Sequence, residues 1–271
     1  LVQSLRELGA DVEYLGAPGR PPLRITARPL GGDRVELPTT ISSQYVSALL
    51  QIGPCLPRGL AVDLLGDITS PTYIDMTAAL ARRFGADVQR SAEQVDRDGE
   101  PTTLTRYLVA PTGLHATDYD VEPDASGASY FLAAAAMTPG ARCTIQGVGS
   151  DSLQGDARFA EVLAKMGAAV STGPDHTTVE GPRRLRGVDV SLNDMPDMAQ
   201  TLAALAVFAE GPTLIRDVGN LRVKETDRIA AIDHELSRIG VDVDVDGDDI
   251  RIAPPPGGRL HHPGGEPVSD A

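Results

Sequence analysis

The chain has 271 residues, a length that corresponds to about two domains of roughly 150 residues each. Hydrophobic residues make up 41% and charged residues 23%, a composition typical of a folded protein and not of a disordered one. The net charge of −14 argues against a surface for nucleic acid or acidic lipid, and without an apolar span or a signal pattern we expect a cytosolic protein.

The first predicted element is a short helix before Gly9, and its pattern returns about every 75 to 80 residues. In each copy, apolar residues at spacings of three and four precede a glycine, as Leu236 and Ile239 precede Gly240. A glycine in this place is typical of a left-handed helix C-cap. The pattern therefore predicts four helices that end at glycine, namely Gly9, Gly85, Gly167 and Gly240.

After each of these glycines the sequence predicts a strand, a turn and a second strand, as in 241–245 and 249–253. The aspartates within 242–246 imitate the start of a calcium loop, but they alternate with valines, and the twelfth loop position is Ala253 instead of glutamate. We therefore predict a hairpin that turns at Asp246 and Gly247, without calcium.

A second block precedes three of the four helices and consists of a strand, a polar patch, an apolar helix and another strand. Its copies are 34–67, 119–149 and 188–218. A full unit is then β-α-β-α-β-β, and the chain holds three full units after the tail of another. This alternation predicts the α/β class (α+β by some schemes), with helices packed against mixed sheets.

The polar patches lie where helix N-caps belong, and the first of them is Ser42-Ser43-Gln44. Free N–H groups and the helix dipole at such an end can hold a phosphate without a basic residue. Plain helix capping is the simpler interpretation of the same residues.

The densest charged segment is 220–228, between a predicted strand at 213–217 and a helix that runs to Ile239. If the helix begins between Glu225 and Arg228, then Lys224 and Arg228 converge on one face beside Glu225. Two cations and a carboxylate can bind an anionic substrate and move protons. A salt-bridged, solvated helix start is the alternative, and Asp197 at the preceding junction is equally interpretable as a helix-start acid.

Metal and cysteine chemistry have little support in the sequence. The five histidines show no ligand spacing, including the pair His261-His262 in the C-terminal tail. The two cysteines, Cys55 and Cys143, are too few for a disulfide scaffold, and we expect both to be buried. No metal and no cofactor are therefore expected.

Several separate motifs resemble those of the 5-enolpyruvylshikimate-3-phosphate synthase family. The most specific is Asn-Leu-Arg-Val-Lys-Glu-Thr-Asp-Arg at 220–228, and the resemblance extends from Leu1 to about Pro254. The other matching motifs are 41–45, 73–77, 124–136 and 154–156.

The resemblance implies an enolpyruvyl transferase fold of two domains, each built from three βαβαββ units. It places the crossover between domains near Val121 and Glu122, so we expect domains at 1–121 and 122–271. It also implies transfer of a carboxyvinyl group from phosphoenolpyruvate to the 5-hydroxyl of shikimate 3-phosphate, with phosphate released. These two small molecules are the expected partners of a monomer that uses no cofactor.

The resemblance also implies roles for individual residues. Ser42, Ser43 and Ser70 would hold the phosphate of shikimate 3-phosphate, while Gln44 and Tyr73 line its site. Asn220 would contact the same substrate, as would Lys224. Asp197 would bind the 5-hydroxyl and help to remove its proton. Lys224, Arg228 and Gln44 would bind phosphoenolpyruvate, and Glu225 would protonate its methylene carbon, so the implied catalytic residues are Asp197, Lys224 and Glu225.

Further motifs of the family have no counterpart in this sequence, among them its N-terminal Lys-Ser segment and its late Asp-His-Arg. We therefore expect an internal piece of a longer enzyme, with little or no activity of its own. One alternative is a non-catalytic remnant that binds shikimate 3-phosphate. A transferase that acts on uridine-diphosphate N-acetylglucosamine is disfavoured, because neither cysteine resembles the reactive loop cysteine of that enzyme.

Overall fold

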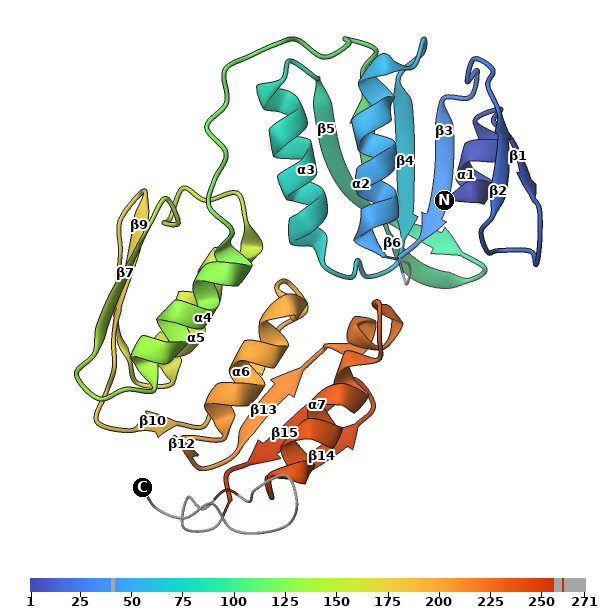
Figure 1. Ribbon diagram of the computed structural model, residues 1–271. Coiled ribbons are helices and arrows are strands. Elements are labelled where there is room, and N and C mark those ends of the chain that lie inside the picture. The colour runs from blue at the N-terminus through green and yellow to red at the C-terminus, as the bar shows by residue number, and fades with distance from the viewer. Residues whose placement is uncertain (40–41, 256–259, 261–271) are drawn as a thin grey trace. The chain divides into compact units, whose positions relative to one another are not determined.

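A computed structural model describes residues 1–39, 42–255 and 260 of the chain, so the His261-His262 pair lies outside the described residues. The chain divides into two compact units, Leu1–Tyr119 and Asp120–Ala271 (Figure 1). Each unit has its own hydrophobic core and is described by itself.

Unit 1 begins with the predicted tail of a repeat and continues with one complete repeat. The tail is α1 (Val2–Glu7) followed by the hairpin of β1 (Asp11–Tyr14) and β2 (Leu23–Thr26). The complete repeat consists of β3 (Arg34–Pro38), α2 (Ser43–Ile52), a short turn η1 (Gly53–Cys55), β4 (Leu60–Leu65), α3 (Pro71–Arg83), β5 (Val88–Arg97) and β6 (Glu100–Val109).

The sheet of unit 1 has the strand order β3-β4-β6-β5, in which β3 and β4 are parallel and the other pairs antiparallel. Strand alternation sends Val62 and Leu64 into a core that α2 and α3 share, where Leu49 and Ile74 are fully buried. On the opposite face of β4, the buried Asp63 accepts hydrogen bonds from Arg34 and Arg106 of the two neighbouring strands.

Unit 2 contains two further repeats. The first has α4 (Ala125–Ala136), β7 (Arg142–Gln146), η2 (Gly155–Arg158), α5 (Phe159–Lys165), β8 (Ala169–Thr172) and β9 (His176–Glu180). The second has β11 (Asp189–Ser191), η3 (Pro196–Met198), α6 (Ala199–Ala206), β13 (Thr213–Arg216), η4 (Gly219–Val223), α7 (Arg228–Arg238), β14 (Asp242–Asp246) and β15 (Asp249–Ala253). A two-residue parallel pair joins β10 (Leu185–Arg186), which lies between the two repeats in the sequence, to β12 (Ala209–Glu210), which lies between α6 and β13.

The second repeat of unit 2 repeats the topology of unit 1. Its strand order is β11-β13-β15-β14, again with the first pair parallel and the others antiparallel. Helices packed against mixed sheets confirm the predicted α/β class. The predicted hairpin is also present, with its turn one residue later than expected: Asp246 pairs with Asp249, so Gly247 and Asp248 form the turn, and the aspartates of β14 all lie on its exposed face.

The first repeat of unit 2 corrects the prediction of three full units, because its opening strand does not form. The described residues 110–124 contain no strand, and the sheet there is β7-β9-β8. The end of this segment carries Asp120 and Glu122 and then Pro123, which cannot donate to a strand ladder. Glu122 is held by its side chain instead, since its carboxylate accepts hydrogen bonds from Ser152 and from the Leu153 N–H.

All four predicted glycine caps are confirmed. Gly9, Gly85, Gly167 and Gly240 have φ values between 84° and 104°, in the left-handed region. In every copy the glycine N–H donates to the carbonyl three residues back, and the next N–H donates to the carbonyl five residues back. This is the Schellman motif, repeated four times.

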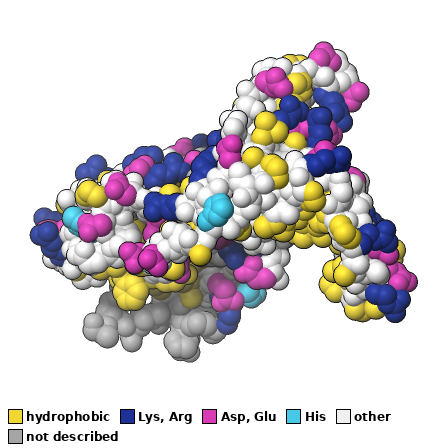
Figure 2. Space-filling view, turned by 90° about the horizontal axis from the view of Figure 1, so that it is seen from above, with side chains coloured by type: hydrophobic (Ala, Val, Ile, Leu, Met, Phe, Trp, Pro, Cys, Tyr) yellow, Lys and Arg dark blue, Asp and Glu magenta, His cyan; other side chains and the backbone are white. Residues whose placement is uncertain are grey.

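The expectation that both cysteines are buried is wrong. Cys143 is partly buried, but Cys55 is exposed, because the turn η1 buries Pro54 and Leu56 on either side of it. None of the described helices has the length and apolar content that a bilayer-spanning helix needs. On the face shown in Figure 2, basic and acidic side chains are interspersed. Exposed ion pairs of the chain include Arg24–Glu13 and Arg184–Glu210.

Candidate active site

The charged segment of unit 2 lies at one edge of its four-stranded sheet. Because β11 and β13 are parallel neighbours, the segments that follow them begin at the same edge. Asp197 lies in η3, which follows β11, and Lys224 and Glu225 lie between η4 and α7, after β13. Asn220 lies in η4 itself. The fold therefore brings together residues that are about 30 positions apart in the sequence.

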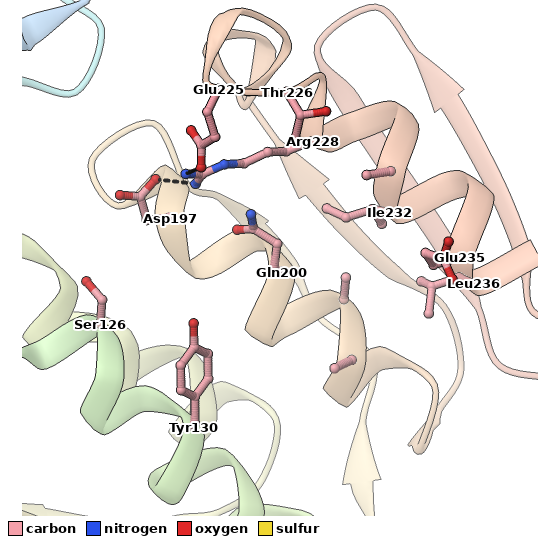
Figure 3. A pocket seen from close by; sticks show the side chains of 13 residues that line it. Ser126, Tyr130, Asp197, Gln200, Glu225, Thr226, Arg228, Ile232, Glu235 and Leu236 are labelled. Atoms are coloured by element: carbon pink, nitrogen blue, oxygen red, sulfur yellow. Dashed lines mark hydrogen bonds and ion pairs between the residues drawn. The ribbon is translucent and has the colours of Figure 1, made fainter.

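Arg228 is the centre of this cluster (Figure 3). Its Nη1 donates to Asp197 Oδ1 at 2.8 Å, and its Nη2 donates to Glu225 Oε1 at 2.5 Å. Lys224 Nζ lies 3.8 Å from the same Asp197 oxygen. The side chains of Arg228 and Lys224 are only 19% and 20% exposed, whereas that of Glu225 is 69% exposed.

The start of α7 differs from the sequence prediction. The helix begins only at Arg228, the last residue of 225–228, so Lys224 and Glu225 precede it; the Asp227 side chain caps it by accepting from the Ala230 N–H at 3.0 Å. Lys224 is therefore outside the helix. It still converges with Arg228 as expected, but through their common partner Asp197 and not through helical spacing.

The contacts in this cluster shift the pKa values of Glu225 and Arg228. The pKa of Glu225 lies below its usual range, because its carboxylate accepts hydrogen bonds from its own backbone N–H and from Arg228. Burial alone would lower the pKa of Arg228, but the hydrogen bonds and charges of Glu225 and Asp197 raise it instead. In the unliganded site Glu225 is thus a carboxylate at neutral pH.

A pocket of about 590 Å³ opens beside this cluster, between α4, α6 and α7. Its polar end holds Asp197, Glu225 and Arg228, and its other walls are largely apolar. The sequence reasoning assigned no role to five further polar residues that line it, namely Ser126, Tyr130, Gln200, Thr226 and Glu235 (Figure 3). Ser126 and Tyr130 belong to the family-like motif 124–136, and this membership could have identified them as site residues.

The motif 154–156 organises the start of α4. Gln154 accepts from the Ala125 N–H at 2.8 Å and donates to the Pro123 carbonyl at 2.7 Å. Asp156, which is 4% exposed, accepts a hydrogen bond from the Ser126 hydroxyl. These contacts satisfy a helix N-terminus and fix Ser126 in the pocket wall.

The candidate phosphate residues of unit 1 lie at the corresponding edge of its sheet. The parallel pair β3 and β4 precedes α2 and α3, so both helix N-termini lie at the carboxyl edge of the strands. The Thr39 hydroxyl joins the two strand ends by donating to the Leu65 carbonyl at 2.9 Å. The two helices pack together, and the Thr77 hydroxyl donates to that of Ser47 at 2.8 Å.

Ser42, Ser43 and Gln44 start α2, and Ser70 and Tyr73 start α3. Ser42 is the N-cap and accepts from the Gln44 N–H at 3.3 Å, which confirms the capping interpretation. Ser70 is 2% exposed and has a left-handed backbone with φ of 55°. A serine in this region is strained, and such strain concentrates at functional sites.

The sequence-predicted residues thus form one set in each unit. Ser42, Ser43, Gln44, Ser70 and Tyr73 belong to unit 1, and Asp197, Asn220, Lys224, Glu225 and Arg228 belong to unit 2. Within the part of the chain that the structure describes, no group of three His, Cys, Asp or Glu side chains is arranged to hold a metal ion.

Comparison with known proteins identifies relatives that all belong to one family. The profile of the family EPSP synthase (3-phosphoshikimate 1-carboxyvinyltransferase) matches residues 1–263. The chain is 44% identical over 256 residues to the 3-phosphoshikimate 1-carboxyvinyltransferase of Haemophilus ducreyi, covering 94% of this chain and 56% of that protein. It is 43% identical over 266 residues to a chloroplastic relative from Nicotiana tabacum, covering 94% and 49%. The chain therefore spans about half the length of the curated relatives it matches.

Solved structures agree with this likeness. The EPSP synthase of Acinetobacter baumannii matches with a TM-score of 0.68 at 27% identity, covering 93% of this chain and 56% of that one. The enolpyruvyl transferase NikO from Streptomyces tendae matches with a TM-score of 0.63 at 22% identity, covering 94% and 57%, and at that identity the likeness concerns the fold alone.

Proposed function

The chain belongs to the EPSP synthase family, and on that premise we propose that it forms part of an enzyme that transfers a carboxyvinyl group. The donor is phosphoenolpyruvate, the acceptor is the 5-hydroxyl of shikimate 3-phosphate, and phosphate is released. The observation that carries the proposal is the meeting of Arg228, Lys224, Asp197 and Glu225 at one sheet edge, in the segment most specific to the family.

The chemistry requires an acid, a base and a clamp for phosphate. Protonation of the methylene carbon of phosphoenolpyruvate develops positive charge at the neighbouring carbon, and the acceptor hydroxyl then attacks there. Loss of a proton from the methyl group and of phosphate restores the vinyl double bond. Glu225 is the proposed acid and Asp197 the proposed base, while Lys224 and Arg228 stabilise negative charge on the donor and the leaving phosphate.

Unit 1 supplies the proposed grip on shikimate 3-phosphate. Two helix N-termini at one sheet edge provide N–H groups and dipoles that favour a phosphate, and Ser42, Ser43 and Ser70 add hydroxyl groups. Gln44 and Tyr73 start the same helices and are proposed to line the sugar-like ring. Asn220 and Lys224 are the proposed contacts from unit 2. Every proposed group is a side chain or backbone group, so the reaction needs no cofactor.

Coupled phosphate release tests the proposed transfer. A full-length protein that contains this chain should release phosphate from phosphoenolpyruvate only when shikimate 3-phosphate is present. Asp197→Asn should lower kcat by about 10²-fold or more, because the hydroxyl loses its base. Intact binding of both substrates without any turnover would contradict the proposal.

A second candidate is a binding remnant that holds shikimate 3-phosphate without catalysis. It is favoured by one observation, namely that all five unit 1 residues lie at the starts of two helices within a unit that has its own hydrophobic core. Calorimetry with shikimate 3-phosphate alone tests it, and an absence of heat would exclude it. We propose a cytosolic monomer in either case, since one chain carries both sets of residues.

A further inference from the structure

Arg228 already holds two anionic groups in the unliganded site. Its guanidinium donates through Nη1 to Asp197 and through Nη2 to Glu225. A guanidinium presents its donors in a fork that matches the oxygens of one phosphate or carboxylate. The two protein carboxylates therefore occupy the donor positions that an anionic ligand requires.

The two carboxylates differ in how firmly they are held. Asp197 is 32% exposed and has a second cation, Lys224, 3.8 Å away. Glu225 is 69% exposed, lies outside the helix that begins at Arg228, and pairs with Arg228 across three residues. Exposed ion pairs contribute little, because water screens their attraction, so Glu225 is the partner that an incoming anion displaces more easily.

We infer that Glu225 is an internal stand-in for an anionic ligand on Arg228, and that a phosphate-like dianion replaces it there while the released carboxyl group takes up a proton. The inference rests on the proposed function for the identity of the natural anion, phosphoenolpyruvate. The exchange itself follows from the contacts of Arg228.

The charges around Glu225 explain the proton uptake. Lys224 and Arg228 face it from its own segment, Asp197 lies across from it on η3, and Glu235 and Tyr130 line the same pocket from α7 and α4. When a dianion binds, it neutralises the two cations and adds negative charge beside Glu225. In the empty site, hydrogen bonds from its own backbone N–H and from Arg228 hold the pKa of Glu225 low, and this pKa rises when the anion takes the place of Glu225 on Arg228.

The exchange would solve a chemical problem of the proposed mechanism. A proton donor must be protonated when the substrate is in place, yet an ion pair with Arg228 keeps Glu225 ionised. If the substrate anion displaces Glu225 from Arg228, substrate binding itself causes the protonation of Glu225. By reciprocity, protonation of Glu225 must strengthen anion binding by the same factor by which the anion favours protonation.

Sulfate is a suitable probe, because it remains a dianion between pH 4.5 and 7, the range of the experiment. Calorimetry of the 271-residue chain in two buffers of different ionisation enthalpy measures the protons taken up per sulfate bound. The wild-type chain should take up a fraction of a proton near pH 5 and bind sulfate more tightly as the pH falls. Arg228→Gln should lose most of this binding.

Two charge-matched variants separate the stand-in role from general electrostatics. Glu225→Gln should bind sulfate about threefold more tightly at pH 7, because it no longer competes for Arg228, and its proton uptake should disappear. Glu235→Gln removes the same charge from the same pocket, but Glu235 pairs with Arg238 and His234 and not with Arg228. Its proton uptake should equal that of the wild type, and its affinity for sulfate should rise by much less than threefold.

The inference is overturned if Glu225→Gln keeps the wild-type proton uptake, or if it gains no more affinity than Glu235→Gln. Absence of sulfate binding in both the wild type and Glu225→Gln would overturn it as well. Near-ultraviolet circular dichroism confirms that each variant is folded, and Glu225→Asp provides a second variant with a retained but displaced charge. The sulfate experiments measure binding and not turnover, so a negative result would contradict the exchange at Arg228 but not the proposed transfer. A failed transfer assay would likewise leave the exchange at Arg228 untouched.

Discussion

Asp63 shows how strongly a single buried charge is held in this fold. Its side chain is 1% exposed on the central strand β4, where it accepts hydrogen bonds from Arg106 at 2.6 Å and from Arg34 at 2.9 Å. Burial alone would raise the pKa of Asp63, but the hydrogen bonds and charges of the two arginines outweigh it and lower the pKa. The three residues tie together the strands β3, β4 and β6.

Asp63→Asn should therefore lower the free energy of unfolding at pH 7 by about 2 kcal/mol, because hydrogen bonds to a charged group are lost. The matched control is Glu36→Gln, which breaks the exposed pair with Arg97 and should cost less than about 0.5 kcal/mol. Denaturant unfolding measures both values. Equal costs for the two variants would contradict this account of the strand contacts.

The contribution of Asp63 to stability depends on pH with a definite sign. Because the folded pKa of Asp63 is lowered, its contribution is fully present above the unfolded value of about 4 and is lost as the pH falls through the folded value. The wild type and Asp63→Asn should thus differ at pH 7 and converge towards pH 2. A difference that is constant from pH 7 to pH 2 would show that charge is not the cause.

The strained backbone of Ser70 allows its hydroxyl to be tested separately from its conformation. Glycine accepts a φ of 55° without strain, so Ser70→Gly should keep α3 and unit 1 folded while binding of shikimate 3-phosphate weakens about tenfold. Asp98→Gly makes the same backbone change at a φ of 58° in the turn between β5 and β6. Calorimetry should find the control unchanged, and equal losses in both variants would refute the role of the hydroxyl.

At the scale of residues, the sequence predicted side chains whose role is local. The N-cap at Ser42 follows from residue type and position, and the structure confirms it. The partners of Arg228 could not be derived in the same way, because Asp197 is 31 residues away and meets it only through the parallel pairing of β11 and β13. The left-handed backbone of Ser70 has no sequence signal, since serine is not a residue that usually adopts it.

At the scale of elements, the helix ends were predictable because their cause is a single residue. Each left-handed position needs glycine, and the four glycines mark the four Schellman motifs. The start of α7 was less predictable, because Asp227 and Glu225 are both plausible helix-start acids and only the contact with Ala230 identifies the cap. The strand expected before α4 is missing because the Glu122 carboxylate bonds to Ser152 and the Leu153 N–H, and Pro123 has no N–H to donate to a strand ladder.

Two of these caps should differ in their tolerance of alanine. Gly167→Ala should cost about 1 kcal/mol or slightly more, because the added carbon has room but the backbone angle is unfavourable. Gly85→Ala should cost more, since its Cβ would lie 2.4 Å from the His115 ring. In a His115→Ala background this clash is absent, so adding Gly85→Ala there should cost only about as much as Gly167→Ala does in the wild type. Thermal or denaturant unfolding checks the cycle, and an equal cost at both glycines would contradict it.

At the scale of the whole molecule, the number of repeats and the comparisons both indicate that the chain corresponds to part of the family's fold. The chain matches about half of the length of its relatives, and the family motifs that it contains lie in two separate units. The net charge of −14 does not exclude the proposed anionic substrates, because helix N-termini in unit 1 and the cations Lys224 and Arg228 in unit 2 would attract them locally.

Turnover by the 271-residue chain should be absent or severely reduced, because phosphoenolpyruvate contacts that the family resemblance implies are missing from this sequence. Phosphate release measured with both substrates checks this. A rate within about tenfold of a complete relative would show that the unit 1 and unit 2 residues suffice by themselves.

A chimeric enzyme tests the central claim most directly. Residues of this chain replace the matching stretch of the Haemophilus ducreyi relative, whose remaining segments complete the protein, and phosphate release from phosphoenolpyruvate is measured. We predict release that depends on shikimate 3-phosphate and that Asp197→Asn within the inserted stretch reduces by about 10²-fold. A chimera that folds and binds shikimate 3-phosphate but releases no phosphate would contradict the account.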